Sequence, residues 1–77
     1  MPEYKIQSIL FNKEIFTLRQ SIEWILHHQQ KINKFVETNK YYRFRQLNPK
    51  TLKDHGFEHY KNIKLKDGVV IISVFKY

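Results

Sequence analysis

Residues 41–49 read Tyr41-Tyr42-Arg43-Phe44-Arg45-Gln46-Leu47-Asn48-Pro49, which places two tyrosines, a phenylalanine and two arginines in five consecutive positions. Because successive side chains of a strand point to opposite faces, Tyr41, Arg43 and Arg45 share one face of a predicted strand. Pro49 cannot donate to a strand ladder, so the strand ends before it. The stretch therefore predicts a strand with one face suited to a core and one aromatic and arginine-rich surface.

Most of the positive charge of the chain follows this point. The 77 residues carry a formal net charge of +7. Residues 1–38 contain five basic and four acidic side chains, a net of +1, and residues 39–77 contain nine basic and three acidic side chains, a net of +6. A basic domain attracts polyanions, most often nucleic acid and sometimes an anionic protein or membrane. The alternative is that the lysines only keep a small, strand-rich protein soluble.

Length and composition restrict the class of protein. A chain of 77 residues is expected to form a single domain, residues 1–77. It has no cysteine, so a disulfide framework and a thiolate metal site are both excluded. The N-terminal residues do not resemble a signal peptide, and the apolar runs are too short to span a bilayer. We expect a soluble intracellular protein.

The first half of the chain predicts a strand followed by a helix. Residues 4–12 are rich in β-favouring side chains, and their imperfect alternation indicates burial on both faces or a bulge. Thr17 and Gln20 form a T-x-x-Q capping box that starts a helix ending near residue 28 or 29. Ser21 is small enough to let this helix approach a sheet closely, and Trp24 is either a core residue or a surface anchor.

Four residues at helical spacing form the predicted apolar face of this helix: Leu18, Ile22, Ile25 and Leu26. Residues 32–40 are predicted as a connector that Phe35 and Val36 anchor to the core. Residues 51–55 are predicted as one helical turn, with Gly56 as its C-terminal cap.

Asp67-Gly68 lies between two β-rich runs, residues 59–66 and 69–76, and predicts a hairpin with a two-residue type I′ turn. Such a turn pairs Lys66 with Val69 and Leu65 with Val70. The resulting core face consists of Ile63, Leu65, Val70, Ile72 and Val74.

The opposite hairpin face then carries the apolar residues Val69, Ile71 and Phe75. An apolar patch of this kind is covered by the connector or serves as a contact surface. These three residues therefore predict a contact surface, either for a second copy of the chain in a homo-oligomer or for an acidic protein partner. No membrane partner is expected.

The predicted order is strand, helix, strand, strand, strand. This is an α+β domain in which one main helix packs on a small, largely antiparallel sheet of about four strands.

The motifs of the chain resemble those of a family of small basic domains from large double-stranded DNA viruses and tailed phages, with no assigned function. The resemblance covers nearly the whole chain and rests on four segments: residues 6–13, 24–27, 42–49 and 64–72. The most specific segment is Y-R-F-R-Q-x-x-P, from Tyr42 to Pro49. At residues 60–62 the sequence Tyr-Lys-Asn departs from the family pattern, which has an arginine there. The resemblance implies a viral origin and a location in the host cytoplasm or nucleus, or in the virion.

The leading functional hypothesis is a non-enzymatic viral or phage accessory protein that binds nucleic acid. Arginines can hold phosphates with two hydrogen bonds, and tyrosines can stack on unpaired bases. The candidate binding residues are Tyr41, Arg43, Arg45, Tyr60, Lys64 and Lys66. They form one surface if residues 59–66 lie beside the central strand; otherwise the arginines are an isolated pair.

The alternatives concern the arginines and the apolar hairpin. Arg43 and Arg45 can instead brace the fold by pairing with Glu37, Asp54 or Glu58. The protein can also be a small virion component or an inhibitor of a host protein that docks through the apolar C-terminal hairpin. Gln46 and Asn48 are expected to satisfy backbone groups at the strand end rather than read bases.

Metal and catalytic functions are not supported by the sequence. The four histidines have no ligand spacing with carboxylates, so no metal and no cofactor are expected. No nucleophile elbow, phosphate loop or carboxylate pair is present, so we expect no enzymatic activity.

Overall fold

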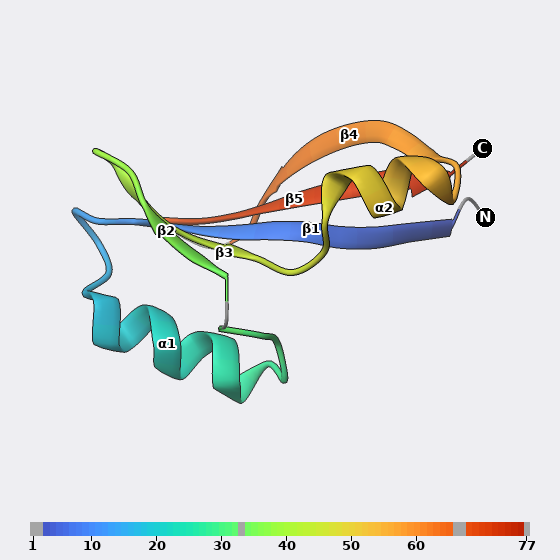
Figure 1. Cartoon of the computed structure of the whole chain (residues 1–77). Coiled ribbons are helices and arrows are strands. Elements are labelled where there is room, and N and C mark those ends of the chain that lie inside the picture. Colours follow the sequence, from blue (N-terminus) through green and yellow to red (C-terminus); the bar gives the residue numbers. More distant parts are fainter. Residues whose placement is uncertain (1–2, 33, 66–67, 77) are drawn as a thin grey trace.

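The computed structural model describes residues 3–32, 34–65 and 68–76, which form one antiparallel sheet with a helix on each side (Figure 1). The sheet order is β2-β3-β1-β5-β4. The predicted α+β class is confirmed, with one edge strand more than expected. The elements in chain order are β1 (Glu3–Asn12), α1 (Leu18–His27), β2 (Phe35–Glu37), β3 (Tyr41–Arg45), α2 (Pro49–Asp54), β4 (Phe57–Lys64) and β5 (Val69–Lys76).

Strand β1 is the middle strand, and a bulge at Gln7 interrupts its pairing with β5. Ile6 lies opposite Ser73, but Ser8 lies opposite Ile72, so Gln7 is an extra residue on β1. A bulge of this kind shifts the alternation of side chains by one position. Ile6 and Ile9 therefore both reach the same core, which explains the imperfect alternation in the sequence.

Helix α1 begins as predicted. The hydroxyl of Thr17 accepts a hydrogen bond from the backbone N–H of Gln20 at 3.1 Å, and the Gln20 side chain accepts one from the Thr17 N–H at 2.9 Å. Ser21 and Ile25 are fully buried against the sheet, as the predicted close approach requires. The predicted apolar face is only partly correct, because Leu18 and Leu26 are exposed at its margins.

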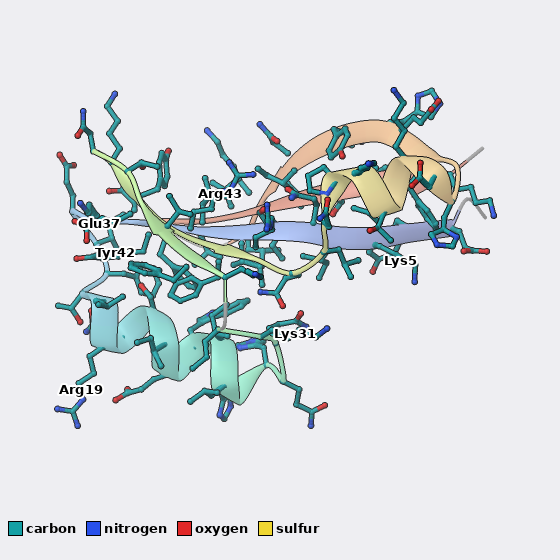
Figure 2. All side chains as sticks on the ribbon, in the orientation of Figure 1. Lys5, Arg19, Lys31, Glu37, Tyr42 and Arg43 are labelled. Carbon is teal, nitrogen blue, oxygen red and sulfur yellow. The ribbon has the colours of Figure 1, made fainter. Side chains whose placement is uncertain are left out.

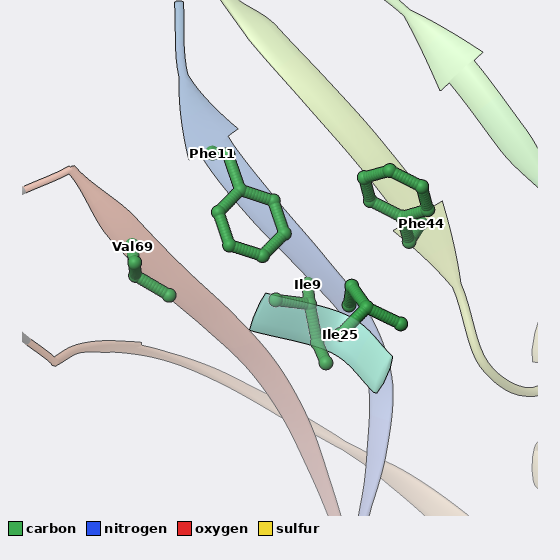
Figure 3. Packing of buried hydrophobic residues seen from close by; sticks show 5 residues of the cluster. All are labelled: Ile9, Phe11, Ile25, Phe44 and Val69. Carbon is green, nitrogen blue, oxygen red and sulfur yellow. The ribbon is translucent and has the colours of Figure 1, made fainter. Parts of the chain in front are cut away.

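The main core lies between α1 and the sheet (Figure 3). Phe11 is its central ring, with edge-on contacts to Phe44 at 5.7 Å and Trp24 at 5.4 Å between ring centroids. Trp24 is half-buried and also stacks on His28 at 3.7 Å. Five buried residues make up this core: Ile9, Phe11, Ile25, Phe44 and Val69.

A second, smaller core lies on the opposite face of the sheet, under α2. It contains Leu52, Phe57 and Val74. The predicted helical turn is a six-residue helix that starts earlier than expected, because Asn48 caps its N-terminus by accepting from the Lys50 N–H. Pro49 occupies the first helical turn, where its missing N–H costs nothing.

The two helices cover opposite faces at opposite ends of the sheet (Figure 1). Helix α1 lies where β1 ends and β5 begins, and α2 lies where β1 begins and β5 ends. Consequently half of the sheet face on the α2 side has no helix over it.

The predicted hairpin register is wrong by one residue. Ile63 lies opposite Ile71 and Lys64 opposite Val70, and the Leu65 N–H donates to the Val69 carbonyl at 3.0 Å. The loop between the paired residues Leu65 and Val69 therefore has three residues instead of the predicted two. The one-residue change turns every side chain of β4 to the other face relative to β5.

The faces of the hairpin differ accordingly from the prediction. Ile63 shares the α1 side with Val69 and Ile71, and the predicted core residues Val70 and Ile72 lie half-buried on the other side. Leu65 is exposed. The predicted turn residue Asp67 lies outside the described residues.

The predicted connector contains the edge strand β2. Phe35 lies opposite Phe44 on β3, and their rings are 5.2 Å apart. Val36 is exposed on the other face rather than anchored in the core. Strand β2 has only three residues, all exposed, which gives too short a pattern for detection from sequence.

Gly68→Ala should destabilise the fold more than Gly56→Ala. Both glycines have positive φ, +85° and +88°, which costs a non-glycine residue about 1–2 kcal/mol. At Gly68 a Cβ would also lie 3.0 Å from Cδ1 of Ile15, whereas at Gly56 the nearest atom is Cε of the flexible Lys76 at 3.4 Å. Urea denaturation should show the larger loss for Gly68→Ala, and equal losses would contradict this packing.

Candidate nucleic-acid interface

The sheet face that α2 packs on has no helix over it where β1 ends and β5 begins, on the side opposite α1. This uncovered area is called the open face. Two rows of side chains cross it from β3 to β4 through β1 and β5. The first row is Arg43, Leu10, Val70 and Lys64; the second is Arg45, Ser8, Ile72 and Asn62.

The two rows have similar ends but different centres, because the first contains Leu10 and Val70 and the second contains the buried Ser8 beside Ile72. Each begins with an arginine on β3 and ends with an exposed polar or basic side chain on β4. Three half-buried apolar side chains, Leu10, Val70 and Ile72, lie between these ends. The open face is thus a largely apolar floor with two arginines on its β3 side and one lysine on its β4 side. It is about 14 Å wide at three inter-strand spacings.

Arg43 is held in place by the bulge on β1. Its Nε donates to the hydroxyl of Ser8 at 3.3 Å, and its Nη2 donates to Oε1 of Gln7 at 3.4 Å. Gln7 is 2% exposed and donates in turn to the Leu47 carbonyl at 3.3 Å. These partners are neutral, so they orient the guanidinium without cancelling its charge (Figure 2 labels Arg43 on the side away from α1).

Arg45 lies with Arg43 in a shallow hollow at the β2–β3 edge. The hollow has a volume of about 470 Å³, and Lys34 also lines it. Lys34 is next to Arg45 because its carbonyl accepts the Arg45 N–H at 2.9 Å. Lys34 was missed from the sequence because the residues after it were not recognised as a strand paired with β3.

The three cations of this hollow have no carboxylate partner among the described residues. The ion pairs in residues 3–32, 34–65 and 68–76 join Lys13 to Glu37 and Arg19 to Glu23. Glu37, one of the expected bracing partners, is thus engaged elsewhere. Within the described chain neither arginine pairs with Asp54 or Glu58. The positive charge at this edge therefore faces solvent uncompensated.

The remaining candidate residues occupy different parts of the same face. Strand β4 is separated from β3 by two strands, so residues 59–66 do not lie directly beside the central strand. Tyr41 and Lys64 nevertheless line one hollow of about 270 Å³. Tyr60 lies opposite Val74 beside α2, about 20 Å along the strands from Tyr41. Lys66 lies outside the described residues.

The apolar residues proposed for a protein contact lie on the other face of β5. Val69 is 3% exposed in the main core, and Ile71 packs against that core. Phe75 is half-buried and contacts the ring of Tyr4 at 5.8 Å. A partner can reach Phe75, but it cannot reach Val69 unless α1 moves.

Gln46 satisfies backbone groups, as predicted. Its side chain accepts from the Lys31 N–H and donates to the Lys31 carbonyl, both at 2.8 Å. The amide thereby ties the segment after α1 to the end of β3. Asn48 likewise accepts from a backbone N–H as the cap of α2.

Two specific features, a metal-ligand cluster and a membrane-spanning helix, are absent from the described residues. Within residues 3–32, 34–65 and 68–76, no three histidine or carboxylate side chains gather where they could hold a metal ion. The described helices include none with the length and hydropathy needed to cross a membrane.

Gln7→Met should destabilise the protein by about 1–3 kcal/mol. Methionine fills the same space but offers no partner to the Ser8 hydroxyl, the Leu47 carbonyl or Arg43, and buried groups left unsatisfied carry such costs. Gln30→Met is the matched control, because the Gln30 side chain donates only to the nearby His28 carbonyl in an exposed setting. Chemical denaturation should show a change within about 0.5 kcal/mol for the control. Equal effects would argue against a structural role of the Gln7 side chain.

The open face combines the oriented guanidinium group of Arg43, two further cations and an adjacent tyrosine on an apolar floor. Guanidinium groups form paired hydrogen bonds with phosphate, and aromatic rings stack on bases. This chemistry suits contact with a nucleic acid. No family model, curated protein or solved structure matches the chain.

Proposed function

We propose that this protein is a non-enzymatic accessory protein that binds nucleic acid through the open face. The resemblance described above makes a virus or phage its proposed source. Arg43, Arg45 and Lys34 make the phosphate contacts, and Lys64 adds charge on the far side. Tyr41 supplies an aromatic ring beside the floor. Tyr60 extends the contact along β4 toward α2. Lys66, which lies outside the described residues, stays a candidate on the basis of the sequence.

The observation that carries the proposal is the cluster of unneutralised cations on one side of the open face. Lysines that serve only solubility are expected to be scattered and solvated. Here two arginines and a lysine line one hollow, and within the described residues no carboxylate neutralises them. A polyanion gains most from such an arrangement, because several cations together release the counterions condensed on its phosphates.

Phosphate fits this hollow better than an isolated carboxylate of an acidic protein does. Arg43 presents a planar group whose orientation Gln7 and Ser8 hold, while part of its surface remains accessible. Two phosphates of one strand can contact Arg43 and Arg45 at the same time, since the two arginines are about 6.8 Å apart along β3. Tyr41 adds a ring that suits a base rather than a carboxylate.

Arg43→Ala combined with Arg45→Ala should weaken nucleic-acid binding at low salt by about tenfold or more. Each lost phosphate contact should also lower the slope of log affinity against log salt by about 0.7–0.9. Fluorescence anisotropy with labelled single- and double-stranded oligonucleotides over a salt series measures both quantities.

The matched control is Arg19→Ala combined with Lys31→Ala, which removes the same charge from the α1 side of the molecule (Figure 2). It should leave the affinity within about threefold, because only long-range attraction changes. Equal losses in the two double variants would show that net charge, and not the open face, drives binding. Absence of binding to every oligonucleotide at low salt would refute the proposed function.

A further inference from the structure

We propose that the nucleic acid bound by the open face is single-stranded, with its phosphates along the β2–β3 edge and its bases over the apolar floor. This inference rests on the proposed function and specifies its ligand. It follows from the unequal chemistry of the two sides of the open face and from the apolar side chains between them.

The phosphate side is the β2–β3 edge. Lys34, Arg43 and Arg45 gather in one hollow there, whereas the β4 ends of the two rows are Lys64 and Asn62, and only one of these is charged. A duplex presents phosphates on both sides of each groove and gains from two similar rows of cations. A single strand has its phosphates on one side only, which matches the observed distribution.

The floor favours exposed base faces. Leu10, Val70 and Ile72 are half-buried in a sheet face that no helix covers. Phosphate and sugar gain little from such side chains, because charged groups lose hydration there without a polar partner. In a duplex the flat faces of the bases stack on each other, and only their edges reach the grooves. In a single strand the base faces are free to lie on an apolar or aromatic surface.

Tyr41 closes one end of this floor. It is half-buried and lines the hollow that also contains Lys64 and Val70. The tight turn before it holds its backbone: the Tyr41 N–H donates to the Thr38 hydroxyl at 3.0 Å, and the Tyr41 carbonyl accepts the Thr38 N–H at 2.9 Å. A base that leaves the apolar floor at this end meets the Tyr41 ring, so Tyr41 is the stacking residue of the site.

The test compares three labelled probes of about 12 nucleotides, a length within the site sizes of single-strand binding domains. They are a thymidine oligonucleotide, an abasic sugar-phosphate strand and a duplex. The protein should bind the thymidine strand at least about fivefold more tightly than the abasic strand, because stacking of one base contributes about 5- to 100-fold. It should also prefer the thymidine strand over the duplex.

Variants of Tyr41 locate the base contact. Tyr41→Ala should lower affinity for the thymidine strand by about 5- to 100-fold and leave the abasic strand unchanged, whereas Tyr41→Phe should retain binding. Tyr4→Ala is the control, because Tyr4 is an exposed tyrosine of the same sheet that lies outside the open face and contacts Phe75. Thermal unfolding establishes whether each variant is folded. If Tyr41→Ala does not fold, the comparison of the three probes on the unmodified protein tests the preference for a single strand.

The outcomes separate this inference from the proposed function. Equal affinity for the thymidine and abasic strands, or a duplex bound as tightly as the single strand, would overturn the inference while nucleic-acid binding itself stands. If Tyr41→Ala binds all three probes as tightly as the unmodified protein does, the role of Tyr41 is also overturned. Failure of all three probes to bind at low salt would refute the proposed function instead.

Discussion

The bulge at Gln7 in the middle of β1 is the constraint from which the two sides of the sheet follow. It lets Ile6 and Ile9 face the main core together, and it turns Gln7 and Ser8 toward the side of the sheet that carries Arg43. A buried polar pair in a central strand is costly unless each atom has a partner. The pair is satisfied by its own hydrogen bond of 2.7 Å, by the Leu47 carbonyl and by the Arg43 guanidinium. The same feature therefore aligns the core and orients a surface cation.

The placement of the two helices explains why an apolar surface is left open. A chain of 77 residues has too little helix to cover both faces of a five-stranded sheet. Helix α1 covers one face where β1 ends, and the shorter α2 covers the other face where β1 begins (Figure 1). Leu10, Val70 and Ile72 remain half-buried between cations, an arrangement that combines apolar contact with attraction of a polyanion.

Features coded by neighbouring residues were predictable from the sequence. The capping box of Thr17 and Gln20, the end of β3 before Pro49 and the burial of Ser21 were all confirmed. The hairpin register was not, because Asp-Gly supports turns of different length and a single residue reverses the faces of β4. Strand β2 was missed because three exposed residues carry no clear alternation, and Lys34 was missed with it. Arg43 and Arg45 were correctly placed on one face with Tyr41, but their partners were not foreseen.

Local sequence was thus sufficient to establish the α+β class, the helix start, and the common face of Tyr41, Arg43 and Arg45. These depend on capping groups and on the two-residue period of a strand, both of which act over a few residues. Strand order, the alignment of Arg43 with Lys64 across two intervening strands, and the support of Arg43 by Gln7 emerged only with the tertiary structure. They join residues from 21 positions apart, as for Arg43 and Lys64, to 62 positions apart, as for Ile9 and Ile71. Such contacts depend on the packing of the whole sheet rather than on any local pattern.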